Sequence, residues 1–195
     1  MSTVKRNTFS DRFSVLARLN EVVFHIDDMA NLWKIKDRNT LHTTLKRYTQ
    51  KGLLFRIYRG FYSIKPPNQI DSLFLGTKAL HQYSYVSTET VLAKAGIIMQ
   101  NASYMTLISP VSKKFSINNY SYRSRKLSDR FLFNNTGINI INNVLTASTE
   151  RATADILYFN PKFYFDAPKL INWKIVRKIQ KEIGYPLTQK NYDLA

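Results

Sequence analysis

The sequence predicts an α+β protein of two domains, a helix-rich N-terminal domain over residues 1–67 and a small mixed α/β domain over residues 68–195. Apolar residues recur at helical spacing in the first part, whereas short β-prone runs dominate the middle of the second. Pro66 and Pro67 stiffen the chain between the two parts and cannot extend a preceding strand. With 195 residues, of which 44% are hydrophobic, the chain is long enough for two small cores.

The N-terminal domain begins with three predicted elements, a helix over residues 9–20, a strand at 22–24 and a helix over 28–34. The first helix follows from apolar residues at a spacing near 3.6, and the strand from a short apolar run. Asp27 is the expected cap of the second helix, because an Asp side chain accepts hydrogen bonds from the first turn of a helix. The residues expected to face inward from that helix are Met29, Leu32 and Trp33.

A third helix is predicted over residues 38–51, after a polar turn, and Gly52 ends it. Its apolar residues at i, i+4 and i+7, which we expect to face the core, are Leu41, Leu45 and Tyr48. Two short strands follow at residues 53–58 and 61–64, joined by an Arg-Gly turn. A helix followed at once by a small basic hairpin is typical of a winged helix-turn-helix domain.

In such a domain the last helix lies in the major groove of DNA, and the hairpin is the wing. Asn pairs with an adenine edge, Arg and Lys reach guanine or phosphate, and a helix N-terminus favours phosphate. The candidate DNA-binding residues are Asn39, Thr40, His42, Thr43, Lys46 and Arg47 on the helix and Arg56 and Arg59 on the hairpin. Lys46 or Arg47 alone would fit any solvated helix face, so the prediction depends on the whole unit.

The C-terminal domain begins with a predicted helix over residues 70–82 and a strand at 83–86. Ser87 or Thr88 is the expected cap of the next helix, which ends at Gly96. Further along the chain, β-branched and aromatic runs alternate with Asn, Gly, Ser and Pro, which predicts a small sheet. The expected strands of this sheet are residues 105–109, 115–122, 130–133 and 138–145.

Two helices are predicted after the sheet, over residues 149–159 and 168–183. The second has isoleucines at every fourth position and basic residues away from them. The stripe expected to pack on the sheet comprises Ile171, Ile175, Ile179 and Ile183. A membrane-surface helix with a basic flank would show the same pattern, but packing on the sheet is the commoner explanation.

The start of the first of these helices carries two carboxylates, Glu150 and Asp155. A paired-carboxylate site for acid–base chemistry is one interpretation, but residues five apart do not share a helix face as i, i+4 pairs do. We favour a structural interpretation, in which Ser148 or Thr149 caps the helix. Glu150 then complements the helix dipole, and Arg151 and Asp155 form an i, i+4 ion pair.

A second basic cluster lies within the predicted sheet, interleaved with aromatic residues. Its members are Lys113, Lys114, Arg123, Arg125 and Lys126, with Arg130 nearby. Alternation along a strand would send the basic and the aromatic residues to opposite faces. Two interpretations remain open, a phosphate-contacting patch and a half-buried sheet with a charged outer face.

The charge of the chain favours a polyanionic partner. The formal net charge is +16, and it is spread evenly: residues 1–68 carry 13 Lys/Arg against 5 Asp/Glu, and residues 69–195 carry 16 against 8. There is no cysteine and there are three histidines, so we expect no disulfide, no metal site and no cofactor. No long apolar run and no leader pattern is present, so we expect a cytoplasmic protein.

Three segments together resemble the AbiEi-like antitoxins, which are transcriptional regulators of abortive-infection toxin–antitoxin operons. They are GLLFRIYRGFYSI at 52–64, YVSTETVLAKAGI at 85–97 and STERATADIL at 148–157, and their order and spacing follow the family pattern. The resemblance spans about residues 10–160. It implies a winged-helix domain, repression of the protein's own operon, and a functional partner that is a nucleotidyltransferase-like toxin, countered without a stable complex.

Two other functions remain open at the level of the sequence. A winged-helix domain can bind RNA or protein instead of DNA, because a fold does not fix its ligand. An enzyme is the third hypothesis, but the sequence offers no convincing nucleophile or acid–base set, so we expect no catalytic activity.

Overall fold

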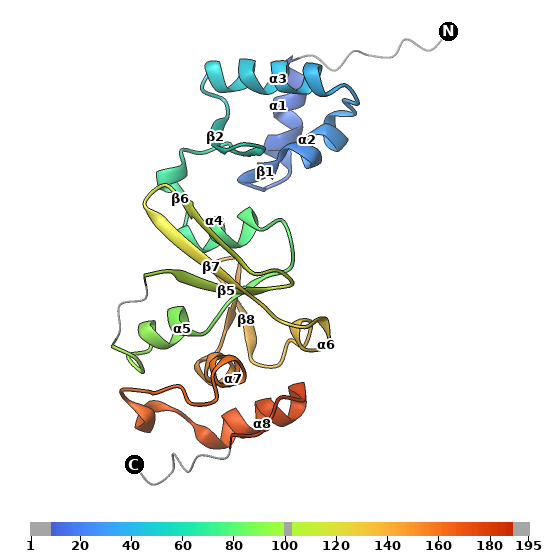
Figure 1. Cartoon of the computed structure of the whole chain (residues 1–195). Coiled ribbons are helices and arrows are strands. Elements are labelled where there is room, and N and C mark those ends of the chain that lie inside the picture. Colours follow the sequence, from blue (N-terminus) through green and yellow to red (C-terminus); the bar gives the residue numbers. More distant parts are fainter. Residues whose placement is uncertain (1–8, 100–102, 189–195) are drawn as a thin grey trace. The chain divides into compact units, whose positions relative to one another are not determined.

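The computed structural model describes residues 9–99 and 103–188 of the 195-residue chain (Figure 1). The chain is of the α+β class and divides into two compact units, Met1–Asp71 and Ser72–Ala195. The boundary expected between residues 67 and 68 falls inside the short 3-10 helix η1, Pro67–Gln69. Within the described residues, no helix is long and apolar enough to cross a membrane.

The N-terminal unit consists of three helices and three short strands. In chain order these are α1 (Phe9–Arg18), β1 (Val23–His25), α2 (Ile26–Trp33), α3 (Arg38–Gln50), β2 (Phe55–Tyr58) and β3 (Phe61–Ser63). The strands form one antiparallel sheet in the order β1-β3-β2, so β2 and β3 are a hairpin and β1 pairs with its inner strand. All of the sequence-predicted elements of this domain are present, with ends shifted by at most two residues.

One hydrophobic core holds these elements together. Trp33 of α2 stacks on Tyr48 of α3 with ring centroids 5.5 Å apart, and its indole nitrogen donates to the carbonyl of Arg12 at 3.0 Å. The predicted stripe of α3 is buried, as are Met29 and Trp33, whereas Leu32 is half-buried. The buried residues of the core are Leu16, Phe24, Met29, Trp33, Leu41, Leu45, Tyr48, Leu54 and Tyr62.

The C-terminal unit contains a six-stranded mixed sheet. Its strands are β4 (Tyr85–Val86), β5 (Met105–Ser109), β6 (Lys113–Ile117), β7 (Tyr120–Lys126), β8 (Ile138–Ile141) and β9 (Val144–Ala147), in the order β6-β7-β5-β4-β9-β8. β6–β7 and β8–β9 are antiparallel hairpins, and they form the two edges. β4 pairs in parallel with β9, and β5 in parallel with β7, so segments distant in sequence meet in the centre.

Helices cover this sheet. They are α4 (Ser72–Ala79), α5 (Glu89–Lys94), α6 (Asp129–Leu132), α7 (Thr149–Phe159) and α8 (Trp173–Ile183), with the 3-10 helix η2 (Pro168–Leu170) before the last. α4 lies on one side of the sheet, and α5, α7 and α8 lie on the other (Figure 1). Gly76 of α4 faces the ring of Tyr122 on β7 so closely that an added Cβ would lie 2.2 Å from it.

The structure corrects several sequence-based expectations about the C-terminal unit. The segments 115–122 and 138–145 are not single strands, because turns interrupt them at Asn118, with φ of 52°, and at Asn142 and Asn143, with φ of 49° and 62°. Asn tolerates this left-handed region, which hairpin turns require. Residues 130–133, expected to be a strand, belong mostly to α6.

The helix caps and the last helix also differ from expectation. Asp27 does not cap α2, because the helix begins at Ile26 with His25 in the N-cap position. The Asp27 carboxylate instead pairs with Arg38 at 2.7 Å. Neither Ser87 nor Thr88 caps α5 through its side chain, since Thr88 makes no cap bond and the Ser87 hydroxyl bonds elsewhere. Residues 168–183 are not one helix, and Ile175 of the expected stripe is 42% exposed, because Val176 faces the core in its place.

Candidate nucleic-acid interface

Helix α3 begins at a well-formed cap. The Asp37 carboxylate accepts a hydrogen bond from the backbone N–H of Thr40 at 2.6 Å, as an N-cap residue does. Hydrogen bonds from Thr40 lower the pKa of Asp37 below its ordinary value, so the carboxylate is charged at neutral pH. One face of the helix is buried, and this fixes which residues the opposite face presents to solvent.

All eight candidate DNA-binding residues are exposed. Six of them lie on α3, and these are Asn39, Thr40, His42, Thr43, Lys46 and Arg47. Arg56 lies on β2 and Arg59 at the turn that joins β2 to β3. Gly60 has φ of +84°, a conformation that L side chains rarely adopt, so the turn that presents Arg59 depends on a glycine.

Four of these residues line one groove between α3 and the hairpin, with a volume of about 360 Å³. The groove is lined by His42, Lys46 and Thr49 of α3 and by Arg56, Arg59, Gly60 and Tyr62 of the hairpin. None of these lining residues is acidic. Thr49 and Tyr62 were not predicted, although Thr49 is seven positions after His42 on the same helix face and Tyr62 pairs with Arg56 across the hairpin.

The other four residues do not line the groove. With about 3.6 residues per turn, Asn39 and Thr43 lie opposite the buried stripe of α3 and continue the exposed face beside Lys46. Thr40 and Arg47 lie on the far flank of the helix, away from His42. The groove residues and the outward-facing pair therefore form one polar surface that runs along the helix and onto the hairpin.

A further hollow of about 510 Å³ lies beside the start of α3. Its polar lining comes from the end of α2, the following turn and the first residue of α3, and includes Asn31, Lys34, Lys36 and Arg38. Asp27, which also lines it, is paired with Arg38 in an ion pair whose side chains are more than half exposed. An exposed pair of this kind contributes little to stability, so the guanidinium can exchange partners at small cost.

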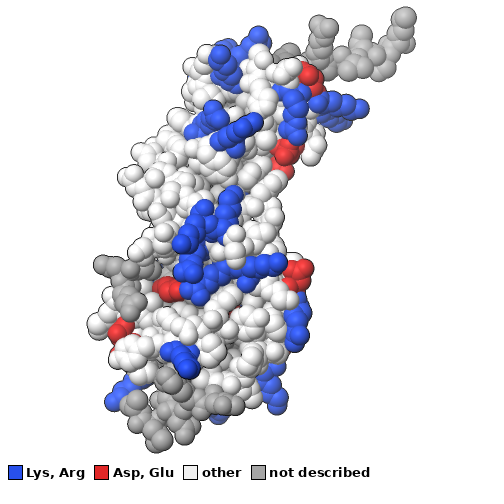
Figure 2. Space-filling model, in the orientation of Figure 1, with Lys and Arg blue, Asp and Glu red and all other residues white. Residues whose placement is uncertain are grey.

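The second basic cluster gathers at the β6–β7 edge of the C-terminal sheet. Its five predicted members line a groove of about 540 Å³ together with Ser112, Ser124 and Phe159. Figure 2 shows a continuous band of Lys and Arg atoms on this part of the unit. The register pairs Lys114 with Arg123 on neighbouring strands, so their side chains share a face. The sequence-based alternation is incomplete here, because Lys113 is two positions before Phe115 on β6 and therefore shares a face with an aromatic residue.

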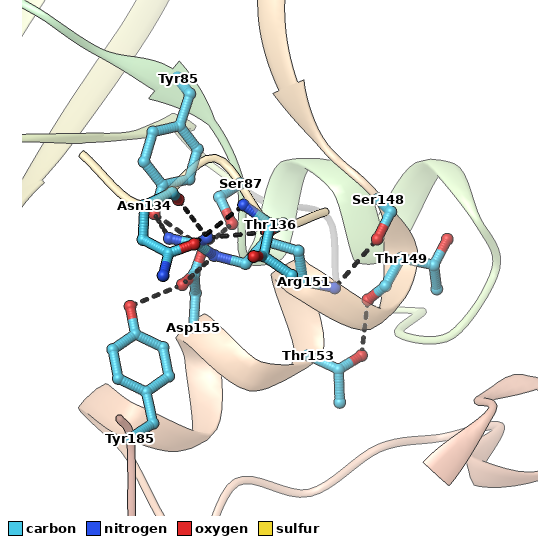
Figure 3. A network of polar contacts seen from close by, with 10 residues as sticks. All are labelled: Tyr85, Ser87, Asn134, Thr136, Ser148, Thr149, Arg151, Thr153, Asp155 and Tyr185. Atoms are coloured by element: carbon cyan, nitrogen blue, oxygen red, sulfur yellow. Dashed lines mark hydrogen bonds and ion pairs between the residues drawn. The ribbon is translucent and has the colours of Figure 1, made fainter. Parts of the chain in front are cut away.

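The most extensive polar network of the C-terminal unit is buried around Arg151 (Figure 3). Its guanidinium donates from Nε to Asp155 at 2.9 Å, from Nη1 to the carbonyls of Asn134 and Thr136, and from Nη2 to the hydroxyl of Tyr85 at 2.7 Å. Arg151 and Asp155 are both 0% exposed. The predicted ion pair is therefore confirmed, but it lies in the core and not on a solvated helix face.

The carboxylate of Asp155 is equally well satisfied. Oδ1 accepts from Arg151 and from the Tyr185 hydroxyl at 2.9 Å, and Oδ2 accepts from Ser87 at 2.7 Å and from Tyr85 at 3.1 Å. Burial raises the pKa of both tyrosines, and the Asp155 charge raises it further. Burial alone would lower the pKa of Arg151, but Asp155 raises it above its ordinary value, so the arginine stays charged.

The geometry of the Arg151 network indicates a structural role. Asp155 has four hydrogen-bond donors and no exposed atom surface for a substrate, and Ser148 caps α7 by accepting from the N–H of Arg151 at 3.1 Å, as predicted. Glu150 is not part of the network. Among the described residues, no group of three or more His, Asp or Glu side chains is placed to hold a metal ion.

Comparison with solved structures shows distant likenesses in fold. The fold is similar to that in the crystal structure of the Rv2827c protein from Mycobacterium tuberculosis, with a TM-score of 0.53 and 12% sequence identity, covering 91% of this chain and 72% of that one. At this identity the likeness concerns the fold alone. No protein-family model and no curated protein matches the chain.

Proposed function

We propose that the N-terminal unit is a winged helix-turn-helix domain and that the protein is a sequence-specific, double-stranded DNA-binding transcriptional regulator. The observation that carries the proposal is the groove in which α3 and the β2–β3 hairpin present Lys46, Arg56 and Arg59 with no acidic residue among the lining. A major groove about 12 Å wide admits one helix, and a basic hairpin beside that helix is placed to follow the phosphate backbone.

The division of roles follows from the chemistry of each side chain. Asn39 and Thr43, on the outermost face of α3, are the proposed base-reading residues, because their short polar groups pair with base edges. Arg56 and Arg59 are the proposed backbone contacts, since a guanidinium binds phosphate through two parallel hydrogen bonds. Such contacts position the protein, and the base contacts supply sequence preference.

The biological role that we propose is that of an autorepressing antitoxin in a toxin–antitoxin operon of the abortive-infection type, acting in the cytoplasm. The resemblance to AbiEi-like antitoxins motivates it, and the partner is a nucleotidyltransferase-like toxin that is countered without a stable complex. Two of the segments that carry the resemblance, 85–97 and 148–157, meet in the Arg151 network, as expected if they serve one fold.

The test is a fluorescence-anisotropy titration of the full chain with the DNA upstream of its own gene. We expect tighter binding to this DNA than to a shuffled duplex, and loss of most of the affinity in the triple variant Lys46→Ala, Arg56→Ala, Arg59→Ala. A matched control removes the same charge from exposed positions of the other unit, Lys162→Ala, Lys169→Ala and Lys174→Ala. Equal affinity for the two duplexes, or equal loss in both triple variants, would contradict the assignment.

The alternative is a winged-helix module for RNA or protein, without antitoxin activity. Competition separates these interpretations: an RNA of the upstream sequence would compete better than the DNA duplex for an RNA-binding module, and a protein-binding module would bind neither. For the antitoxin role, expression of the neighbouring gene should arrest growth, and co-expression of this chain should restore it. If no such neighbour exists, the regulator proposal stands without the antitoxin role.

A further inference from the structure

The basic groove at the β6–β7 edge has a charge that the C-terminal fold does not need. Five cationic residues line it, and only Arg125 has a carboxylate partner among the described residues, Glu89. Like charges at this density repel one another in a compact unit, so they carry an energetic cost that a structural role does not explain.

Arg125 forms the floor of this groove. Its side chain is 16% exposed, pairs with Glu89 of α5 and lies over the ring of Phe159 of α7, with 5.3 Å from the guanidinium carbon to the ring centroid. These contacts fix the position of Arg125, and the carboxylate of Glu89 neutralises its charge. The Nε of Arg125 and the Oε2 of Glu89 are buried and have no hydrogen-bond partner among the described residues. The floor therefore has one donor and one acceptor that are free to bind a further group.

The remaining cations surround this floor and are exposed. The ammonium nitrogens of Lys113 and Lys114 lie over aromatic rings, at 5.6 Å from the centroid of Phe115 and 5.4 Å from that of Tyr104, and both lysines remain exposed. Arg123 and Lys126 come from β7. Of the lining residues, none is Asn or Gln, the side chains that read adenine edges.

From this arrangement we infer that the β6–β7 groove is a second nucleic-acid site, which binds the sugar–phosphate backbone without reading sequence. Exposed Lys113, Lys114, Arg123 and Lys126 supply the cationic contacts, and Arg125 is a positioning residue. This site is distinct from the α3 groove and uses other residues. It would raise the affinity for specific and random sequences alike, because phosphate contacts carry no sequence information.

The first test is the salt dependence of binding of the full chain to a random-sequence DNA duplex and to an RNA duplex of the same sequence. In the triple variant Lys114→Ala, Arg123→Ala, Lys126→Ala, the slope of log K against log salt should become shallower by about 2–3 on DNA. Each lost phosphate contact accounts for about 0.9 of this change. The matched control is the Lys162→Ala, Lys169→Ala, Lys174→Ala variant, which removes the same charge and should change the slope by less. A slope equal to that of the control on both duplexes would overturn the inference.

The second test measures protection at each of the two sites separately and needs no variant of the β6–β7 groove. Lysine acetylation with and without duplex, followed by mass spectrometry, should show Lys113, Lys114 and Lys126 protected, and Lys162 and Lys174 unprotected. The protection should persist in the Lys46→Ala, Arg56→Ala, Arg59→Ala variant, so failure of the α3 groove and failure of this site are distinguishable. Protection of Lys46 alone, with no change at the three groove lysines on either DNA or RNA, would refute the second site and leave a protein partner for the patch.

Discussion

Tyr85 and Arg151, 66 residues apart in the chain, are joined by a 2.7 Å hydrogen bond from the guanidinium to the phenol oxygen in the core of the C-terminal unit. The bond links β4 in the centre of the sheet to the first turn of α7, and Arg151 also binds the backbone carbonyls of the segment before β8. One side chain thus ties together three separate parts of the fold. Its partner Asp155 adds Tyr185 beyond α8, so the network spans the unit.

We predict that Arg151→Ala strongly destabilises the protein. The change leaves the Asp155 charge buried without its cation, which typically costs about 3–5 kcal/mol. Urea unfolding followed by circular dichroism measures this. The double variant Arg151→Met, Asp155→Leu should lose less than the sum of the two single changes, because it removes both charges together. Additive losses would show that the pair is not coupled.

Stability should fall at high pH through the buried tyrosines. Tyr85 and Tyr185 have pKa values raised above the ordinary 10.0 by burial and by Asp155, so the folded state keeps protons that the unfolded state releases above pH 10. The two tyrosines therefore contribute their full stabilisation of the folded state below about pH 10. Above about pH 10 the free energy of unfolding falls by about 1.4 kcal/mol per pH unit for each tyrosine. In Tyr85→Phe the slope of unfolding free energy against pH should be shallower by that amount. An unchanged slope would contradict the burial of this phenol.

Gly76→Ala should destabilise, although Gly to Ala inside a helix ordinarily stabilises by about 1 kcal/mol. The added Cβ would meet the Tyr122 ring at 2.2 Å, and overpacking typically costs about 1–3 kcal/mol. Thermal unfolding gives the sign directly. As the control, the same change in a Tyr122→Ala background should cost less, because the ring has been removed. A stabilised Gly76→Ala variant would mean that α4 does not pack on β7 in this way.

Most of the helices were predictable because their signals are local, whereas α6 was expected to be a strand. The stripe of Leu41, Leu45 and Tyr48 and the cap at Ser148 lie within a few residues of one another, and the structure has them as expected. The β2–β3 hairpin was predicted, but the β6–β7 and β8–β9 hairpins were each taken for a single strand. The β-prone runs continue through Asn118 and through Asn142, and only the backbone conformation shows that the chain reverses there.

Local sequence patterns could not predict that the Arg151–Asp155 pair is buried. An i, i+4 ion pair usually lies on a solvated face, and the sequence around α7 gives no sign of the partners that bury it. Those partners, Tyr85, Ser87 and Tyr185, lie between 30 and 70 residues away from Asp155 and meet it only through the sheet topology. The α3 groove differs, because local patterns point to the two lining residues that were not predicted: Thr49 repeats the helix face of His42, and Tyr62 pairs with Arg56 across the hairpin.

Changing Asn39 or Thr43 to Ala should relax the preference for the operator without unfolding the protein. Both side chains are exposed on the face of α3 opposite its buried stripe, and loss of a good base contact costs about 1–3 kcal/mol of discrimination. Competition of operator and random duplexes measures the preference, with exposed Gln69→Ala as a control away from α3. If both variants keep the wild-type preference, the outward face of α3 does not read bases.

Arg59→Ala should weaken binding to operator and random DNA by the same factor. Arg59 is exposed at the hairpin turn, lines the groove with Lys46, and is proposed to bind phosphate and not a base. Loss of one phosphate contact flattens the slope of log K against log salt by about 0.9, whereas loss of a base contact changes the operator-to-random ratio. Titration of both duplexes over a range of salt separates the two roles. A slope equal to that of a Lys162→Ala control would remove Arg59 from the phosphate contacts, and a changed ratio would make it a base reader.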